Sequence, residues 1–250
     1  MKHKLLLVPF VLALAGAGCG GGSTPEATGS NPAPAVAPVA VSSNCTNPYY
    51  PFKVGSKISY KTKSGSTSST YSVEVQQAAT ADAFKLAYLF ESEAGSMPVA
   101  QEFTCESGVI RAKGQLDMPS VAGGASISYT TNSVDGPFLP SDMNVGTKWD
   151  TTYNVTMHTT NPVLAKMMDG KNQSTHIKSE VIGEESVTVP AGTYTALKVK
   201  MNVEIKSDIS KQPMGTTSEM WFVKGIGMVK SISGTGATKS VTEASVVSGF

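Results

Sequence analysis

The stretch Leu197-Lys198-Val199-Lys200-Met201-Asn202-Val203-Glu204-Ile205-Lys206 alternates apolar and polar side chains without interruption. Successive side chains of an extended strand point to opposite faces of the sheet, so this period of two predicts a strand with one buried and one solvated face. Such alternation is typical of antiparallel sheets, because parallel sheets are usually covered on both faces. A strand of this length spans about 33 Å, which suits a curled sheet or an open barrel.

Other segments of the chain carry the same alternation or a shorter form of it, and turn-forming residues separate them. The further strands that the pattern predicts are Ile58–Lys63, Tyr71–Gln76, Phe84–Phe90, Ser126–Thr131, Trp149–Met157, Thr175–Ile182, Ser218–Val223 and Met228–Ser233. The segment Val189-Pro190-Ala191-Gly192 predicts a tight turn, with Pro at its second position and Gly where a left-handed backbone is needed. The chain is therefore expected to be all-β.

One short helix is expected within this β pattern. Asn161-Pro162 can cap and begin it, Val163–Met168 fills about two turns, and Gly170 can end it. An internal repeat is also visible: Val54-Gly55-Ser56-Lys57-Ile58 resembles Val145-Gly146-Thr147-Lys148-Trp149. We expect two related β units, at about 45–125 and 137–250, in one antiparallel curled sheet or open half-barrel, with the helix inserted in the second unit. Chance similarity in a chain rich in Val, Gly and Thr is the alternative.

Charge and composition exclude several classes of protein. The chain has 250 residues, 20 Lys+Arg against 19 Asp+Glu, and Arg111 as its single arginine. Nucleic-acid recognition normally needs a basic face rich in arginine, so we expect no nucleic-acid partner. A hydrophobic content of 40% is too high for a disordered chain. These figures predict a globular domain large enough to bury a core.

The N-terminus resembles a bacterial lipoprotein signal peptide. Lys2 and Lys4 form a cationic start, Leu5–Leu14 is apolar, and small residues lead to Cys19. The resemblance implies removal of residues 1–18 and acylation of Cys19, and Gly20 after the cysteine implies delivery to the outer membrane. Acyl chains on Cys19 would anchor the protein there as its lipid partner. The alternative is an ordinary secretory signal cut near Ala17.

Residues 19–44 are predicted to be the acylated cysteine and a flexible linker, because this segment is almost entirely Gly, Ser, Thr, Pro, Ala, Val and Asn. With Cys19 acylated, Cys45 and Cys105 are the two cysteines left for a disulfide in an oxidising periplasm. That bond would stabilise the fold by up to about 4 kcal/mol on the chain-entropy model. Two buried thiols or one reactive cysteine are the alternatives.

A second resemblance rests on three segments of the sequence: Tyr49-Tyr50-Pro51 followed by Val54-Gly55, the segment from Val187 to Val199, and the segment from Trp221 to Lys230. They are similar to a widespread group of bacterial envelope proteins of unknown function, with a "VPAGT" strand that precedes a "WF…GxGxV" hairpin. The resemblance implies a β-rich, half-barrel-like fold with some similarity to periplasmic lipoprotein-carrier domains. It implies no activity.

The sequence offers little that indicates catalysis. No nucleophile elbow, zinc-protease, phosphate-loop or EF-hand pattern occurs. His158 and His176 are symmetric about residue 167, so a hairpin could bring them together with Glu180 and hold a transition metal, although two exposed polar histidines are the simpler interpretation. We expect a non-catalytic protein with no cofactor and no resident metal, and a hydrolase or metal-binding protein is the remote alternative.

Large, adaptable apolar side chains suggest a binding role. A curled sheet with the 163–168 helix as a lid could enclose an apolar small molecule or a lipid. The candidate ligand-contacting residues are Trp149, Met167, Met168 and Trp221. The same residues could simply form the core. In that case the protein would be a structural module of the envelope that docks another envelope protein along an exposed strand edge.

Overall fold

The structure is a computed structural model that describes residues 46–51, 53–78, 80, 82–92, 95–114, 118–121 and 125–250. The predicted signal peptide, Cys19, the linker and Cys45 lie outside the described residues. The elements in chain order are β1 (Thr46–Asn47), β2 (Tyr50–Pro51), β3 (Lys57–Ser64), β4 (Thr67–Gln77), β5 (Ala83–Ser92), β6 (Gly95–Glu106), β7 (Val109–Ala112), β8 (Met118–Val121), β9 (Ala125–Asp135), β10 (Lys148–Thr159), α1 (Pro162–Met168), β11 (Lys171–Val189), β12 (Gly192–Ser207), β13 (Ser210–Val223), β14 (Gly227–Ser233), η1 (Gly236–Thr238) and β15 (Ser240–Ser248).

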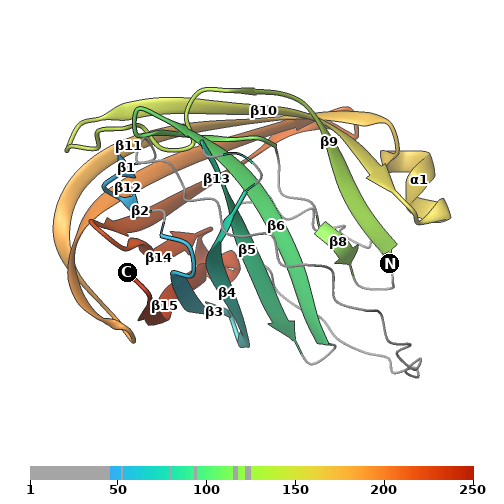
Figure 1. The fold of residues 1–250 in the computed structure, drawn as a ribbon. Helices are drawn as coiled ribbons and strands as arrows, with labels where there is room; N and C mark the ends of the chain where they lie inside the picture. Colours follow the sequence, from blue (N-terminus) through green and yellow to red (C-terminus); the bar gives the residue numbers. More distant parts are fainter. Residues whose placement is uncertain are drawn as a thin grey trace, which may run out of the picture.

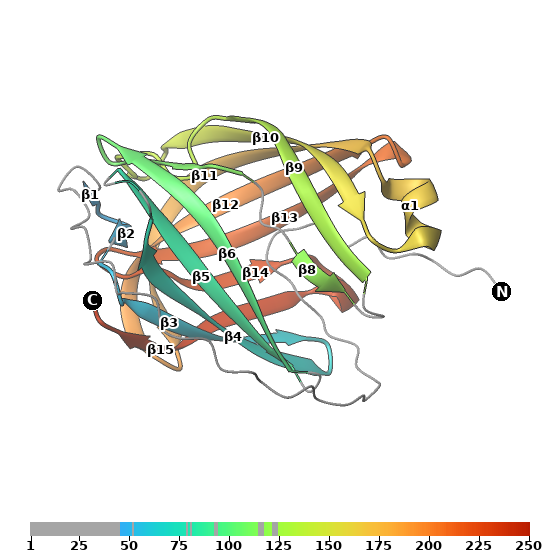
Figure 2. The same ribbon diagram turned by 45° about the vertical axis from the view of Figure 1, so that its right-hand side comes forward.

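Strands β3 to β15 form one antiparallel sheet of 13 strands in the order β7-β6-β5-β4-β3-β15-β14-β13-β12-β11-β10-β9-β8. Consecutive strands of this sheet pair with each other, except β7 and β8. The pairing of β15 with β3 joins two meanders, β3–β7 and β8–β15. The sheet curls into a nearly closed barrel with an unsealed seam between its outer strands β7 and β8 (Figures 1 and 2).

The predicted fold class is confirmed: the chain is nearly all β, antiparallel and curled, with one short α-helix. The sheet curls further than the half-barrel that the sequence suggested. The helix begins as expected, since the Asn161 side chain accepts hydrogen bonds from the backbone N–H groups of Val163 and Leu164. Among the described residues, no helix is long and apolar enough to cross a membrane.

The segment between β9 and β10 bridges the seam at one end. The backbone N–H of Ile110 on β7 donates to the carbonyl of Leu139 at 2.9 Å, and the N–H of Phe138 donates to the Ile110 carbonyl at 2.7 Å. Phe103 stacks on Phe84 with ring centroids 5.1 Å apart and also contacts Phe138. Four of these five side chains are fully buried. Since burying each contributes about 1.5–3 kcal/mol, this cluster is a major source of stability.

The two copies of the sequence repeat form the same turn. Gly55 and Gly146 have φ angles of 87° and 95°, which a side chain would disfavour. The Gly55 N–H donates to the Val75 carbonyl, and the Gly146 N–H donates in the same way to the Val181 carbonyl. Val75 and Val181 each donate back to the residue after the glycine. The turn therefore begins β3 and β10 in the same manner, while the division into two repeat units stays a prediction.

The β1–β2 hairpin closes the end of the barrel where these turns lie, and we call this the capped end. The Asn47 side-chain amide donates to the carbonyls of Gly108 and Pro140, both at 2.8 Å. The Pro48 carbonyl accepts from the N–H of Gly225 in the β13–β14 turn. The hairpin therefore holds three separate turns together.

Cys105 is buried on β6. Thr46, the residue after Cys45, lies against the β6–β7 turn, because a Cβ atom added to Gly108 would come within 2.8 Å of the Thr46 carbonyl oxygen. Cys45 itself lies outside the described residues. The Cys45–Cys105 disulfide stays a prediction, and peptide mapping of the unreduced full chain would check it by the presence or absence of the linked peptide.

We predict that Asn47→Ala lowers the free energy of unfolding by about 2–3 kcal/mol, because two hydrogen bonds to backbone carbonyls are lost in a buried setting. Urea denaturation of the full chain measures it. Asn154→Ala is the control, since the Asn154 amide donates to Ser133 on the exposed surface, and it should cost less than about 0.5 kcal/mol. Equal effects of the two substitutions would contradict the bridging role of Asn47.

Candidate ligand-binding site

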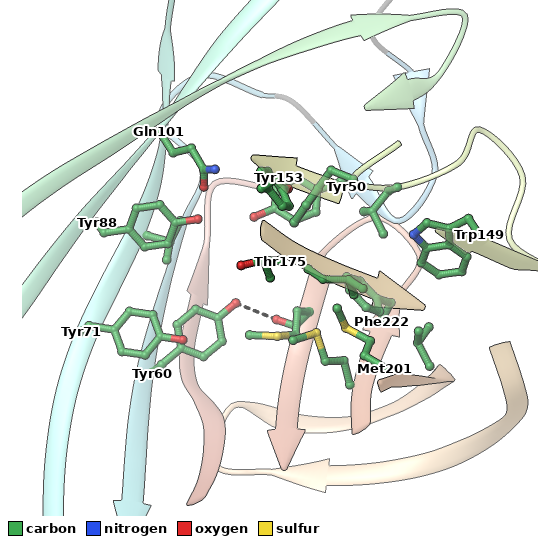
Figure 3. A pocket seen from close by; sticks show the side chains of 17 residues that line it. Tyr50, Tyr60, Tyr71, Tyr88, Gln101, Trp149, Tyr153, Thr175, Met201 and Phe222 are labelled. Atoms are coloured by element: carbon green, nitrogen blue, oxygen red, sulfur yellow. Dashed lines mark hydrogen bonds between the residues drawn. The ribbon is translucent and has the colours of Figure 1, made fainter. Parts of the chain in front are cut away.

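An interior cavity of about 180 Å³ lies within the barrel. Its lining comes from β2 to β6, from the segment that bridges the seam, and from β10 to β14. No lining residue is charged. Figure 3 shows the side chains converging from opposite walls. Residues of both meanders therefore line the cavity, and neither meander could form it alone.

One wall of the cavity is aromatic and carries hydroxyl groups. Five tyrosines line the cavity: Tyr50, Tyr60, Tyr71, Tyr88 and Tyr153. Tyr60 and Tyr71 are cross-strand partners on β3 and β4, and their rings stack at 4.8 Å. Tyr88 is the partner of Val73 on the next strand pair, so the inward positions of three adjacent strands supply this wall.

The tyrosine hydroxyls differ in their partners. Tyr60 donates a hydrogen bond of 2.7 Å to the Met228 carbonyl. The Tyr71 hydroxyl is buried and has no hydrogen-bond partner. Figure 3 shows the hydroxyls of Tyr60, Tyr71, Tyr88 and Thr175 directed toward the middle of the cavity. A buried hydroxyl without a partner costs about 1–3 kcal/mol, which a bound polar atom would recover.

Burial makes these hydroxyls harder to ionise than ordinary tyrosine hydroxyls. Desolvation raises the pKa of Tyr60, Tyr71 and Tyr88 well above the ordinary value, with a further contribution from neighbouring tyrosines. Desolvation also raises the pKa of Tyr153, to about 12. Since a protonated phenol can donate as well as accept, the wall offers neutral hydrogen-bonding groups at physiological pH.

The opposite wall is apolar and adaptable. Met201, Met220 and Met228 line it together with Val199 and Phe222, all on β12, β13 and β14. Methionine side chains are unbranched and polarisable, so they adjust to ligands of different shape. The cavity thus combines an apolar wall with a hydroxyl-bearing wall and excludes charge.

Tyr50 lines the cavity from the capped end. It comes from β2, and its ring meets the edge of Phe138 at 6.3 Å and 78°. Because Asn47 holds the same hairpin in place, the N-terminal segment contributes directly to the cavity wall.

A protein-family model described as DUF3108-like matches residues 53–239. The chain belongs to the DUF3108-like family. Two solved structures share the fold. One is a protein of Parabacteroides distasonis ATCC 8503 described as a lipoprotein, with 18% identity, a TM-score of 0.55, and coverage of 81% of this chain and 99% of that one. The other, from Bacteroides fragilis NCTC 9343, is described as exported with a YmcC-like fold and has 15% identity, a TM-score of 0.54, and coverage of 82% and 100%.

No curated protein matches the chain. The resemblance to envelope proteins is confirmed in a coarser form: the chain is DUF3108-like, and its structural neighbours are described as exported or as a lipoprotein. At these identities, the structural similarity shows the fold of the DUF3108-like chain.

Of the four candidate ligand-contacting residues, Trp149 lines the cavity and Trp221 does not. Trp221 points to the outer face of β13, where its indole N–H donates to Glu185 at 2.7 Å and Lys198 lies 5.0 Å from the ring. Its chain neighbour Phe222 points inward instead. Met220, Trp221 and Phe222 form a continuous apolar run. The sequence alone therefore did not show which of these side chains point into the barrel.

The other two candidates lie on α1 and do not line the cavity. Met168 is buried and Met167 is 46% exposed. The helix packs on β10 beside the end of the barrel away from β1 and β2, as Figure 2 shows. The expected lid over the cavity is therefore not formed by this helix.

The two histidines do not face each other, which corrects the expected pairing. Lys171 pairs with Met157 and His176 with Thr152, so the hairpin is centred near residue 164 and not 167. His158 lies 3.5 Å from Asp169, and His176 lies 3.2 Å from Asp150. The described residues contain no group of three or more His, Cys, Asp or Glu side chains that could hold a metal ion.

The tyrosine lining of the cavity was not predicted from the sequence. Tyr60, Tyr71, Tyr88 and Tyr153 each stand at the apolar positions of a period-two strand, so the pattern could have shown that they point inward. Their convergence depends on the strand register, which the pattern does not contain.

We predict opposite effects for two identical substitutions on stacked neighbours. Tyr60→Phe should lower the free energy of unfolding by about 1–2 kcal/mol, because the hydrogen bond to Met228 is lost. Tyr71→Phe should leave it unchanged or raise it by about 1 kcal/mol, because an unpartnered hydroxyl is removed. Urea denaturation of the full chain compares them. A loss for Tyr71→Phe as large as for Tyr60→Phe would mean that this hydroxyl already has a partner.

Proposed function

We propose that this DUF3108-like protein is a non-catalytic, outer-membrane lipoprotein, acylated at Cys19, whose barrel binds a small, largely apolar ligand. The observation that carries the binding role is the uncharged cavity between the tyrosine and methionine walls. A core that served only stability would be expected to fill this space, because protein interiors pack as densely as organic crystals. An unpartnered buried hydroxyl, that of Tyr71, supports the same conclusion.

The volume limits the ligand. An apolar cavity of about 150 Å³ accepts benzene, so the 180 Å³ here suits a group of about six to eight carbon atoms by proportion. A whole diacyl lipid exceeds this size. A short acyl chain, a terpene-like fragment or one ring system fits it.

The lipoprotein assignment is supported by the signal-like N-terminus and by the structural neighbours described as exported and as a lipoprotein. We predict that cells fed a clickable fatty-acid analogue label the wild-type chain and that the label is found in the outer-membrane fraction. Cys19→Ser should abolish the label and the control Cys105→Ser should retain it. A labelled Cys19→Ser chain would contradict acylation at this residue, and a label confined to the inner membrane would contradict the location.

Native mass spectrometry of the full chain, isolated from envelope membranes in a mild detergent, tests the binding role. We predict a bound mass that is distinct from the detergent and from the covalent acyl groups. Met201→Trp should remove the bound mass, because the indole fills the cavity that Met201 lines. Lys200→Trp, the exposed neighbour on the opposite face of β12, should retain it.

Melting temperatures of the two variants establish that both are folded, and Val199→Phe provides a second, smaller filling of the same cavity. A wild-type chain that carries no bound mass, or a mass retained in both filled variants, would overturn the binding role. A docking module of the envelope would then be the better interpretation.

A further inference from the structure

The buried polar side chains of the described residues carry no charge. Apart from Asn47 they are all serines and threonines. Lysine and glutamate side chains instead form ion pairs on the outer face, such as Lys230 with Glu243 at 2.7 Å. The barrel interior is thus polar in places and nowhere ionic within the described residues.

Five of these buried hydroxyl residues form a continuous patch that we call the hydroxyl belt: Thr62, Ser218, Ser231, Ser240 and Thr242. They lie on β3, β13, β14 and β15, which are adjacent in the sheet. Thr62 and Thr242 are cross-strand partners with hydroxyls 2.9 Å apart, and Ser231 pairs with Thr242 on the other side. Ser218 and Ser240 share Ser233 as their common partner.

The belt borders the cavity. Ser218 is the cross-strand partner of Met201, and Ser231 is the partner of Met220, both of which line the cavity. Cross-strand partners point to the same face with Cβ atoms about 5 Å apart. Thr62 follows Tyr60 by two residues on the same face of β3. The inner surface therefore changes from tyrosine and methionine to serine and threonine along the same strands.

Several buried hydroxyl groups of the described residues have no hydrogen-bond partner. Among the residues that the structure describes, four buried side-chain oxygens have no hydrogen-bond partner: those of Tyr71, Ser179, Ser218 and Ser240. Tyr71 lines the cavity, Ser179 pairs with Met201, and the other two belong to the belt. All are more than nine-tenths buried. Native proteins rarely leave such groups unsatisfied, and a polar ligand group beside the cavity would complete those that it reaches.

We propose that the ligand is an uncharged amphiphile, with an apolar part of about six to eight carbons in the cavity and a hydroxyl- or ester-bearing head on the hydroxyl belt. This inference rests on the proposed function and names its substrate class. The absence of buried charge decides against an ionic head, because a carboxylate or ammonium moved into this interior would lose its hydration without gaining a counter-ion. Serine and threonine hydroxyls can donate to an ester carbonyl and accept from a hydroxyl.

Monooctanoylglycerol is the probe, since it has an eight-carbon chain, an ester and two hydroxyls without charge. Octanol shares the chain with a single hydroxyl, and octanoate shares the chain with a charge. The full chain carrying Trp221→Phe is placed in otherwise protein-free phosphatidylcholine vesicles. Trp149, which lines the cavity, is then the one remaining tryptophan of the two in the sequence, so its fluorescence reports occupancy. Empty vesicles correct for partition of the probes into lipid.

The expected order of affinity is monooctanoylglycerol, then octanol, then octanoate. The double variant Ser218→Ala with Ser240→Ala should weaken monooctanoylglycerol binding about tenfold, since two hydrogen bonds to the head are lost, and should change octanol binding less than about twofold. Its melting temperature should not fall, because neither hydroxyl has a partner in the unliganded protein. Ser72→Ala, on the outer face of β4, is the control and should change no affinity.

Octanoate binding as tight as that of monooctanoylglycerol, or an unchanged affinity in the double variant, would overturn the assignment of ligand class while leaving the cavity as a binding site. Failure of every octyl probe to alter Trp149 fluorescence, together with no bound mass in native mass spectrometry, would overturn the proposed function itself. A double variant with a lower melting temperature would show that the two serines are structural, and this too would overturn the role of the belt.

Discussion

Pairing between β3 and β15 is the contact on which the barrel depends. These strands lie near opposite ends of the chain, and Thr62 and Thr242, which hydrogen bond across the pair, are 180 residues apart. Without this pairing the two meanders would be separate sheets, each with an exposed apolar face. The entropy cost of closing so long a loop grows only logarithmically with its length. Burial of the apolar faces of both meanders in a shared interior can therefore outweigh this cost. The cavity is a consequence, since the Tyr60 hydroxyl on β3 meets the Met228 carbonyl on β14 only across the intervening β15.

Period-two alternation was enough to predict the fold class and most strands. In an antiparallel sheet with one buried and one solvated face, apolar and polar residues alternate along each strand. β15 was missed for a physical reason: its inward residues Ser240, Thr242 and Ala244 are small or polar, so the strand has no apolar alternation. β6 was missed because Pro98 and Gln101 interrupt its pattern, although Phe103 and Cys105 are buried. The short strands β1, β2, β7 and β8 were not predicted either, since two to four residues are too few to show a period of two.

The candidate site was harder to predict than the fold, because it depends on register. Trp149 was predicted to contact the ligand and does line the cavity, whereas Trp221 points outward to Glu185 and Lys198. A shift of one residue reverses the face of every side chain, and the Trp221–Phe222 step coincides with an irregularity in the pairing of β13 with β14. The histidine pairing failed for the same reason, as the true centre of the hairpin differs from the expected one by a few residues.

The β1–β2 hairpin, the first described part of the chain, contributes to the interior of the barrel. Asn47 binds turns on both sides of the seam, and three residues later Tyr50 lines the cavity. A chain segment that only linked a membrane anchor to a domain would need no buried side chain, since a flexible linker makes few contacts. Here the first described residues make hydrogen bonds to three turns and place one side chain in the cavity lining. Displacement of this hairpin would release the Gly108 and Pro140 carbonyls and remove Tyr50 from the cavity lining. The stability of the capped end and the shape of the cavity are therefore set by the same few contacts.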